Sequence, residues 1–315
     1  MNANPDLLSI VREGASAPVS PGVQALAEQA LRRHGDAVQA ILFYGSCRRR
    51  GDDGGLVDLY LLVDSYRAAY DRLATAVWNK VLPPNVFYLA TSFQGRPVRA
   101  KYAVVSLADF QRGTSRRWFH SYLWGRFAQP SGLIYARDER VAAAVLEAVS
   151  QAVVTFTARV VPLLPPSFEA GDLWREGLRL SYGAELRPED SDRVARLYDE
   201  SRDHCDRVTR AALKTIPFHV EVPELTGSAY RARIPKRARY VCAIAWRIRS
   251  AQGKLLSALR LLKAAFTFDG GADYILWKIE RHSGAKLDVS PQLRRHPIVA
   301  ACVLSWRLYR RGAFR

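Results

Sequence analysis

The stretch Ile41–Asp64, ILFYGSCRRRGDDGGLVDLYLLVD, decides the fold of this chain. It begins with a short apolar run that ends at a Gly-Ser pair, continues through a segment dense in Gly, Asp and Arg, and closes with a second β-type run, Leu56–Val63. Because side chains alternate along a strand, Asp58 should lie on the same face as Tyr60 and on the opposite face from Leu59.

Strand, Gly-Ser pair, polar loop and strand with an embedded acid is a layout that resembles the DNA polymerase β-like nucleotidyltransferases. The resemblance implies that Gly45 lets backbone N–H groups approach phosphate oxygens closely, while Ser46 adds a hydroxyl donor. Asp58 would hold the Mg²⁺ that bridges those phosphates. A plain buried strand with one structural Asp is the alternative, because a Gly-Ser pair alone is a weak signal.

That fold usually carries Asp-x-Asp, and Tyr60 stands here in place of the second acid. Asp64 shares a face with Asp58 but lies about 20 Å further along an extended strand, too far to share a metal ion. Asp52, Asp53 and Glu185 are the candidates for a further acid.

Length and composition indicate a globular protein of two or three modest domains, with 315 residues of which 49% are apolar. The four cysteines lack partners at metal-ligand spacing, which argues against a zinc site or a disulfide framework and suits a reducing compartment. The N-terminal residues have no secretory signal pattern, and the most apolar window, Val141–Ala158, has the periodicity of a packed helix. We therefore expect a cytoplasmic protein.

The net charge of +17 is concentrated in the C-terminal third. From Leu225 to Arg315 there are 19 Lys and Arg against 4 Asp and Glu, a net charge of +15, whereas the rest of the chain has 28 against 26. Such an asymmetry indicates a polyanionic partner, either nucleic acid or an anionic membrane, although a solvated surface can have the same composition.

Hydrophobic periodicity predicts a mixed α/β region followed by helices. Strands are expected over 41–44, 56–63, 85–90 and 98–106. Helices are expected over 21–33, 66–81, 140–161, 171–182, 190–212 and 240–266. Residues 217–235 are expected to be irregular.

Residues 107–126 are rich in aromatic residues and arginine, and Trp118, Tyr122 and Arg126 recur at a spacing that places them on one helical face. We expect Arg126 and Lys101 to neutralise a triphosphate together, because neither can do so alone. The alternative is that the two aromatic residues are core residues and Arg126 is a surface charge.

Four motifs together resemble the mitochondrial-type CDP-diacylglycerol synthases, also called phosphatidate cytidylyltransferases. The motifs are Tyr44-Gly45-Ser46 with Val57-Asp58, Lys101-Tyr102-Ala103-Val104-Val105, Trp118-x-x-x-Tyr122-x-x-Gly125-Arg126-x-x-Gln129-Pro130, and Leu180-Ser181-Tyr182-Gly183-Ala184-Glu185-Leu186-Arg187. Their order and spacing match the family across residues 41–210. The chain departs from the family pattern at Ala103 (Gly in the family), Gln129 (Lys) and Glu185 (Asp).

The resemblance implies transfer of a cytidylyl group from CTP to phosphatidate in phospholipid synthesis, with Mg²⁺ as the cofactor. The catalytic residues would be Asp58, which also ligates the metal, Lys101 and Arg126. The nucleotide-binding residues would be Tyr44, Gly45, Ser46, Lys101, Tyr122 and Arg126. Members of this family carry one Asp followed by apolar residues, so Tyr60 fits the family pattern.

The resemblance also implies a polymerase β-like nucleotidyltransferase domain over 1–138, a helical, winged-helix-like domain over 139–224 and a basic helical C-terminal region over 225–315. In the second domain Tyr182, Glu185 and Arg187 would face the active site, unless they form a turn between packed helices.

The last predicted helix, 297–311, is apolar and aromatic on one face and cationic at its end. It resembles an interfacial helix that docks on an anionic membrane through Trp306, Arg307, Arg310 and Arg311. As a bacterial member of the family, the protein would be peripheral on the inner face of the cell membrane. A core-packing helix with charges near its C-terminus has the same pattern.

Two other classes of function remain open. A nucleic-acid-binding protein, or a nucleotidyltransferase that acts on RNA, would also use a segment of net charge +15. We expect no nucleic-acid partner, because the chain has no aromatic RNA-binding motif, zinc finger or convincing helix-turn-helix pattern. A degenerate transferase kept as a membrane scaffold is the third possibility, because of Tyr60.

Overall fold

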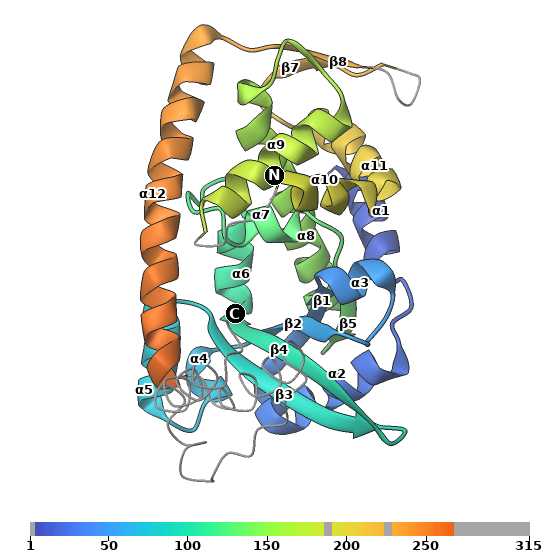
Figure 1. Cartoon of the computed structure of the whole chain (residues 1–315), viewed down its shortest axis with the longest axis vertical. Helices are drawn as coiled ribbons and strands as arrows, with labels where there is room; N and C mark the ends of the chain where they lie inside the picture. Colours follow the sequence, from blue (N-terminus) through green and yellow to red (C-terminus); the bar gives the residue numbers. More distant parts are fainter. Residues whose placement is uncertain (1–3, 186–190, 224–228, 268–315) are drawn as a thin grey trace, which may run out of the picture.

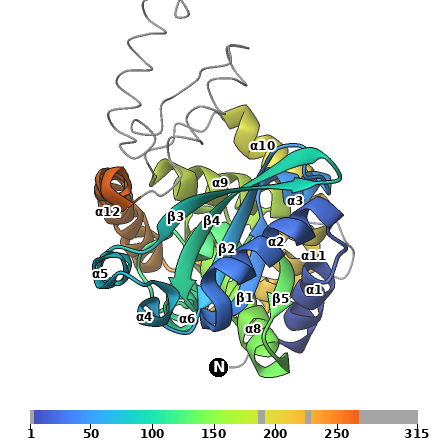
Figure 2. The same ribbon diagram turned by 90° about the horizontal axis from the view of Figure 1, so that it is seen from below.

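The computed structural model describes residues 4–185, 191–223 and 229–267. The five strands of the central sheet are β1 (Val38–Tyr44), β2 (Leu56–Val63), β3 (Asn85–Phe93), β4 (Arg96–Ser106) and β5 (Gly132–Ala136). Their order is β3-β4-β2-β1-β5 (Figures 1 and 2). β2 and β4 are parallel and the other neighbouring pairs are antiparallel, so the sheet is mixed.

The alternation predicted for β2 is confirmed by the two hydrophobic clusters that cover the sheet. Tyr60 and Leu62 belong to the cluster on one face, and Leu59 and Leu61 belong to the cluster on the other. All four side chains are fully buried, whereas Asp58, near the start of the strand, is partly exposed. The acid therefore lies at the edge of a dry core.

Helices cover both faces of the sheet. The Leu59 face is covered by α2 (Pro21–His34), α4 (Tyr66–Ala69) and α5 (Leu73–Val81), with the short 3-10 helix Gly35–Ala37 before β1. The Tyr60 face is covered by α6 (Leu107–Thr114), α7 (Trp124–Phe127) and α8 (Glu139–Val160). The fold is therefore α/β, as the sequence predicts.

The long helix α8 lies in the core and packs against several other helices of the molecule. Together with the 3-10 helix Val161–Leu163 it is long and apolar enough to cross a membrane by length and composition, and 61% of that apolar window is buried inside the protein.

Further helices and a small sheet lie beyond α8. The helices are α9 (Ala170–Gly183), α10 (Ser191–Asp199) and α11 (Arg202–Leu213), and the strands are β6 (Ser167–Phe168), β7 (His219–Glu221) and β8 (Tyr230–Arg233). The three strands pair in the order β6-β8-β7. The first helix of the chain, α1 (Pro5–Ala15), packs against both α8 and α11.

The helix α12 (Lys236–Thr267) runs along one side of the molecule, from the small sheet to the region of α5 (Figure 1). Several of its polar side chains donate to backbone carbonyl groups of the body of the protein. Trp246 Nε1 donates to the oxygen of Arg159 (2.8 Å), Arg249 Nε to that of Phe119 (2.6 Å), and Lys263 Nζ to that of Pro84 (2.9 Å).

Two predicted helices are interrupted in the structure, and one predicted helical face is not formed. Residues 66–81 form α4 and α5, because Tyr70 adopts an extended backbone conformation. Residues 190–212 contain α10 and α11, separated by a turn. The helical face predicted for Trp118, Tyr122 and Arg126 is wrong: α6 ends at Thr114, whose hydroxyl bonds back to the carbonyl groups of its own helix, and Ser115 is extended.

Other elements were not expected from the sequence. These are α1, β5, β6, the helix α3 (Ser46–Arg50) in the predicted polar loop, and β7 and β8 in the predicted irregular region 217–235. The predicted helix 297–311, with Trp306, Arg307, Arg310 and Arg311, lies outside the described residues, as does Arg187.

Candidate functional site

Strand pairing brings two of the predicted catalytic residues together. Asp58 on β2 is opposite Tyr44 on β1 and opposite Lys101 on β4, and Lys101 is in turn opposite Tyr88 on β3. Partners in register point to the same face of a sheet, so the four side chains form a row across it. Lys101 Nζ lies 3.3 Å from Asp58 Oδ1, and both side chains are about a quarter exposed.

Gly45 is held against this row. Its φ of +86° lies in the region that favours glycine, and a Cβ atom built on it would be 2.7 Å from Asp58 Oδ2. Ser46 follows as the first residue of α3. A glycine is therefore required here twice, by the backbone conformation and by the proximity of the Asp58 carboxylate.

Tyr60, at the position of the second acid of Asp-x-Asp, is a core residue. Its ring packs against Phe127 and Tyr44, with centroids 4.9 Å and 5.2 Å away. Burial raises the pKa of Tyr60 well above its ordinary value, so the phenol stays neutral. The side chain supplies an apolar floor below Asp58 instead of a metal ligand.

Each candidate for a further acid is held by an arginine. Asp52 pairs with Arg50 at 2.8 Å and Asp53 with Arg96 at 2.6 Å, and hydrogen bonds from these arginines lower the pKa of both carboxyl groups. Glu185 pairs with Arg126. Across the described part of the chain, no three His, Cys, Asp or Glu side chains gather in an arrangement that could hold a metal ion.

Arg126 lies near Tyr44 and Tyr60, with only 9% of its side chain exposed, and the segment that carries it is here called the wall of the site. Its Nη2 donates to both carboxylate oxygens of Glu185 at 2.9 Å, and its guanidinium lies 4.1 Å from the centroid of the Tyr122 ring. Burial alone would lower the pKa of Arg126, but Glu185 and the neighbouring tyrosines raise it well above the ordinary value. The guanidinium therefore stays charged in a largely dry environment.

The end of α9 contributes a second contact to this wall. Gln129 Nε2, just after α7, donates to the hydroxyl of Tyr182 at 3.1 Å. Tyr182 and Glu185, which the sequence predicts to face the site, therefore both contact the segment that carries Arg126.

Sequence reasoning missed a cavity of about 300 Å³ between α12, α6 and the loop after α5. His120 and Arg260 line it, and the guanidinium of Arg260 lies 4.1 Å from the Tyr122 ring centroid. Burial lowers the pKa of His120 to about 3, and its Nδ1 accepts a hydrogen bond from the backbone N–H of Tyr122 (3.3 Å). No local pattern relates these residues, because Arg260 is far away in the sequence.

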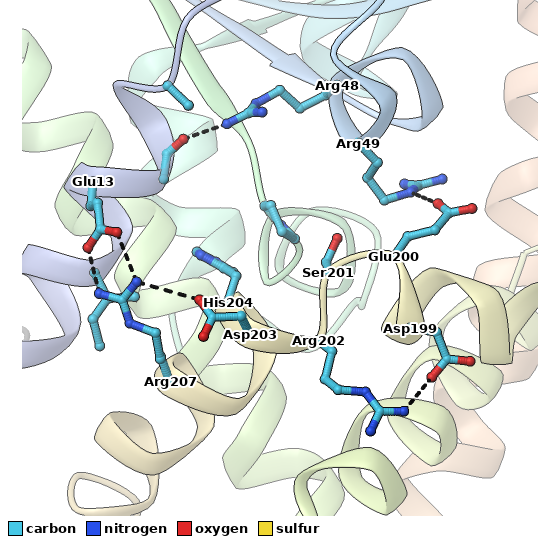
Figure 3. Close-up of a pocket in the computed structure, with 14 residues that line it drawn as sticks. Glu13, Arg48, Arg49, Asp199, Glu200, Ser201, Arg202, Asp203, His204 and Arg207 are labelled. Carbon is cyan, nitrogen blue, oxygen red and sulfur yellow. Dashed lines mark hydrogen bonds and ion pairs between the residues drawn. The ribbon is translucent and has the colours of Figure 1, made fainter. Parts of the chain in front are cut away.

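A larger cavity of about 610 Å³ lies behind α3, between α1 and the turn from α10 to α11 (Figure 3). Two arginines of α3 reach into it. Arg48 Nη2 donates to the carbonyl oxygen of Gly14 (2.6 Å), and Arg49 Nε pairs with Glu200 (2.6 Å). The helix that follows Gly45 is therefore tied to two other parts of the molecule.

Comparisons with known proteins add little to this geometry. No model of a known protein family matches the chain, and no curated protein is significantly similar to it. A solved structure of a nucleotidyltransferase-like protein from Exiguobacterium sibiricum aligns over 92% of this chain and 92% of its own, with 11% sequence identity and a TM-score of 0.26. A similarity of this size does not establish a shared fold. The chain is a mixed α/β protein with an acid and a lysine paired across β2 and β4, two neighbouring interior strands of its sheet.

Proposed function

We propose that the protein is a nucleotidyltransferase with a polymerase β-like catalytic domain, which transfers the cytidylyl group of CTP to phosphatidate and releases pyrophosphate. The observation that carries the proposal is the close approach of the Asp58 carboxylate to Gly45, where a Cβ atom would lie 2.7 Å from Oδ2, next to the ion pair of Asp58 with Lys101. A close backbone turn, a carboxylate and an ammonium group at one point are the parts that phosphoryl-group chemistry uses.

Magnesium fits this site in one specific way. Asp58 is the carboxylate of the row, and the described residues provide no cluster of three metal ligands. Mg²⁺ is commonly held by one or two carboxylates together with phosphate oxygens and water. Asp58 would therefore hold the ion jointly with the nucleotide, and the ion would supply charge neutralisation at the transferring phosphate.

The chain's own residues would position the nucleotide and neutralise its charge. A phosphate oxygen of phosphatidate forms a bond to the α-phosphorus of CTP, and the bond from that phosphorus to the oxygen bridging to the β-phosphate breaks. Because the attacking oxygen is already an anion, no general base is needed. Lys101 would move from Asp58 to the phosphates, and Ser46 would donate to them.

Arg126 would act from the wall of the site. It is charged and largely desolvated, which strengthens its attraction for a phosphate, and its Nη2 donates to Glu185. Its Nη1 also donates to the carbonyl oxygen of Tyr122 at 3.1 Å. We propose that Glu185 and this carbonyl group orient the guanidinium and that the remaining N–H donors of Arg126 face the nucleotide. Tyr44 and Tyr122 would line the same space.

The acceptor implies a location. Phosphatidate lies in a bilayer, so the protein would act as a peripheral protein on an anionic membrane, at the inner face of the cell membrane. The C-terminal third, with its net charge of +15, supports this part of the proposal.

One assay tests the proposal. The full-length chain is incubated with Mg²⁺, each of four labelled nucleoside triphosphates in turn, and phosphatidate vesicles or RNA. A liponucleotide formed with CTP is the expected result. Label transferred to RNA would instead support the RNA-directed alternative, and no transfer to any acceptor would refute nucleotidyltransferase activity.

A further inference from the structure

Among the described residues, every large apolar side chain that is exposed lies on α5 or on α12. On α5 they are 50% to 69% exposed and comprise Leu73, Val77, Trp78 and Val81. On α12 they are 38% to 70% exposed and comprise Tyr240, Val241, Ile244, Ile248, Leu255, Leu259 and Leu262. Single exposed apolar residues are common on protein surfaces, but their confinement to two helices is not.

On α12 these residues form a continuous stripe. They recur at intervals of three, four and seven positions, so they follow one side of a helix that is about 48 Å long. The opposite side, with Trp246, Arg249 and Lys263, is buried against the body of the protein. The stripe therefore faces outward along the whole described helix.

The exposed residues of α5 lie next to the end of this stripe. Arg260 Nε donates to the carbonyl oxygen of Pro83, and Lys263 Nζ to that of Pro84, both at 2.9 Å. These prolines lie two and three residues after the end of α5. Figures 1 and 2 both show α5 beside the C-terminal end of α12. The two helices thus form one outward surface, here called the α5–α12 face.

The charges on this face have one sign. Neither α5 nor α12 contains an acidic residue. Lys80 on α5 and Arg237, Arg247 and Lys254 on α12 are all exposed. Apolar residues flanked by cations, with an exposed tryptophan, are typical of helices that lie in the interface of an anionic bilayer.

We propose that the α5–α12 face docks the protein on an anionic lipid surface. Its apolar side chains enter the headgroup region, and its lysines and arginines contact anionic headgroups. This extends the proposed function by naming the surface through which a lipid acceptor is approached, and it rests on that function only for the identity of the acceptor.

Charge disfavours two other partners for the α5–α12 face, a second copy of the chain and residues 268–315. A second copy of the chain would bring the same acid-free helix against α12. Residues 268–315 of the chain contain 9 Lys and Arg against 4 Asp and Glu, so they too are basic. An anionic lipid surface complements the face, and neither of these does.

The test is co-sedimentation of the full-length chain with vesicles of phosphatidylcholine, with and without phosphatidylglycerol, in the absence of nucleotide. The wild-type chain should bind vesicles that contain phosphatidylglycerol. Two double variants remove apolar side chains from the contact: Val77→Ser with Trp78→Ser on α5, and Ile248→Ser with Leu255→Ser on α12. Each should weaken binding to these vesicles at least about tenfold, because two apolar side chains are lost.

Variants that remove charge separate the electrostatic contribution to vesicle binding from the apolar one. Arg247→Gln with Lys254→Gln should weaken binding to the anionic vesicles and reduce its sensitivity to salt. A matched pair on another surface, Arg202→Gln with Lys214→Gln, removes two half-exposed cations and should bind like the wild type. Circular dichroism checks that all variants are folded, which is expected because every substituted side chain is exposed.

Three outcomes would overturn the proposal. The first is unchanged vesicle binding by the apolar pairs. The second is a wild-type dimer in sedimentation equilibrium that the same pairs convert to a monomer, since a second copy would then cover the face. The third is a Leu259→Cys chain whose new thiol reacts with a maleimide as slowly as buried Cys205, since the rest of the chain would then cover the face.

The outcome is independent of the proposed chemistry. If the wild-type chain binds vesicles but transfers no nucleotide to any acceptor, the docking face stands and the proposed function fails. If the apolar pairs lose vesicle binding but keep activity on phosphatidate dispersed in detergent, both stand.

Discussion

Gly45 is the residue at which the backbone and the candidate chemistry are most directly linked. A Gly45→Ala chain would strain a positive φ and also push the Asp58 carboxylate away from its present position. Gly51 provides a matched control, because its φ is +70° but a Cβ there would meet nothing within 4 Å.

We expect Gly51→Ala to lose about 1 kcal/mol of stability from backbone strain, and Gly45→Ala to lose more, because its ψ of −163° at positive φ is a conformation that essentially only glycine adopts. Only Gly45→Ala should also lose nucleotide transfer, by about a hundredfold or more. Urea unfolding and initial-rate measurements check this. Equal activities for the two variants would show that the contact of Gly45 with Asp58 has no catalytic role.

Asp58→Asn keeps the shape of the side chain and removes its charge. Product formation should fall by at least about a hundredfold, because both the metal ligand and the partner of Lys101 are lost. The melting temperature should change little, since the pair is partly exposed. Asp52→Asn, at a carboxylate held by Arg50, is the control and should stay active.

The pair of Arg126 and Glu185 can be separated by kinetics. Arg126→Ala should reduce kcat/KM for CTP about a hundredfold, as loss of one preorganised charge typically does. Glu185→Gln keeps a hydrogen-bond acceptor beside the guanidinium and should cost less than tenfold if its role is to orient Arg126. A normal kcat/KM for Arg126→Ala would show that the arginine has a structural role. In that case both variants should lower the melting temperature clearly while their kinetics stay close to those of the wild type.

At the scale of the element, the packing of α12 beside His120 makes stability depend on pH. The pKa of the buried imidazole is about 3 in the folded protein and about 6.5 in the unfolded chain. Between these values the unfolded chain binds more protons, so the free energy of unfolding falls as the pH falls through this window.

His120→Asn can keep the acceptor for the N–H of Tyr122 and cannot titrate. Between pH 7 and pH 4.5 the wild-type chain should lose about 2 kcal/mol more than this variant in urea unfolding. His204, whose pKa is lowered to about 4 by burial, contributes in the same direction in both chains.

Elements with strong periodicity could be predicted from the sequence, and elements fixed by distant contacts could not. β2 and α8 were predicted almost to the residue, because burial on one or both sides imposes a clear pattern on them. β5 was missed because its five residues become a strand only by pairing with β1. The region 107–126 has helical spacing, but the local bonds of Thr114 and Ser115 end the helix early.

At the scale of the whole molecule, the strand patterns predicted that Asp58 and Lys101 each lie on a strand, and the family resemblance implied that the two share a site. The sequence could not place Glu185 on Arg126, since 59 residues separate the two and only the packing of α9 on α7 brings them together. The same holds for His120 and Arg260.

Removal of the C-terminal residues tests whether the predicted helix 297–311 contributes to membrane docking. A chain that ends at Pro291 lacks the predicted helix 297–311 but keeps the α5–α12 face. If the missing helix contributes to docking, binding to anionic vesicles and activity on phosphatidate in vesicles should both fall, while CTP binding and activity in detergent should be less affected. A truncated chain that no longer folds would instead identify that helix as part of the core.

The ties of α3 give the start of the chain an unexpected importance. Arg48 fastens this short helix to the carbonyl group of Gly14 in α1, and Arg49 fastens it to Glu200 (Figure 3). An N-terminal fusion or a protease cut that loosens α1 would therefore free one anchor of the helix that starts at Ser46. Such a preparation would still be folded by circular dichroism, but on the proposed function it would bind CTP more weakly. Samples with an intact N-terminus are accordingly the ones in which activity should be sought.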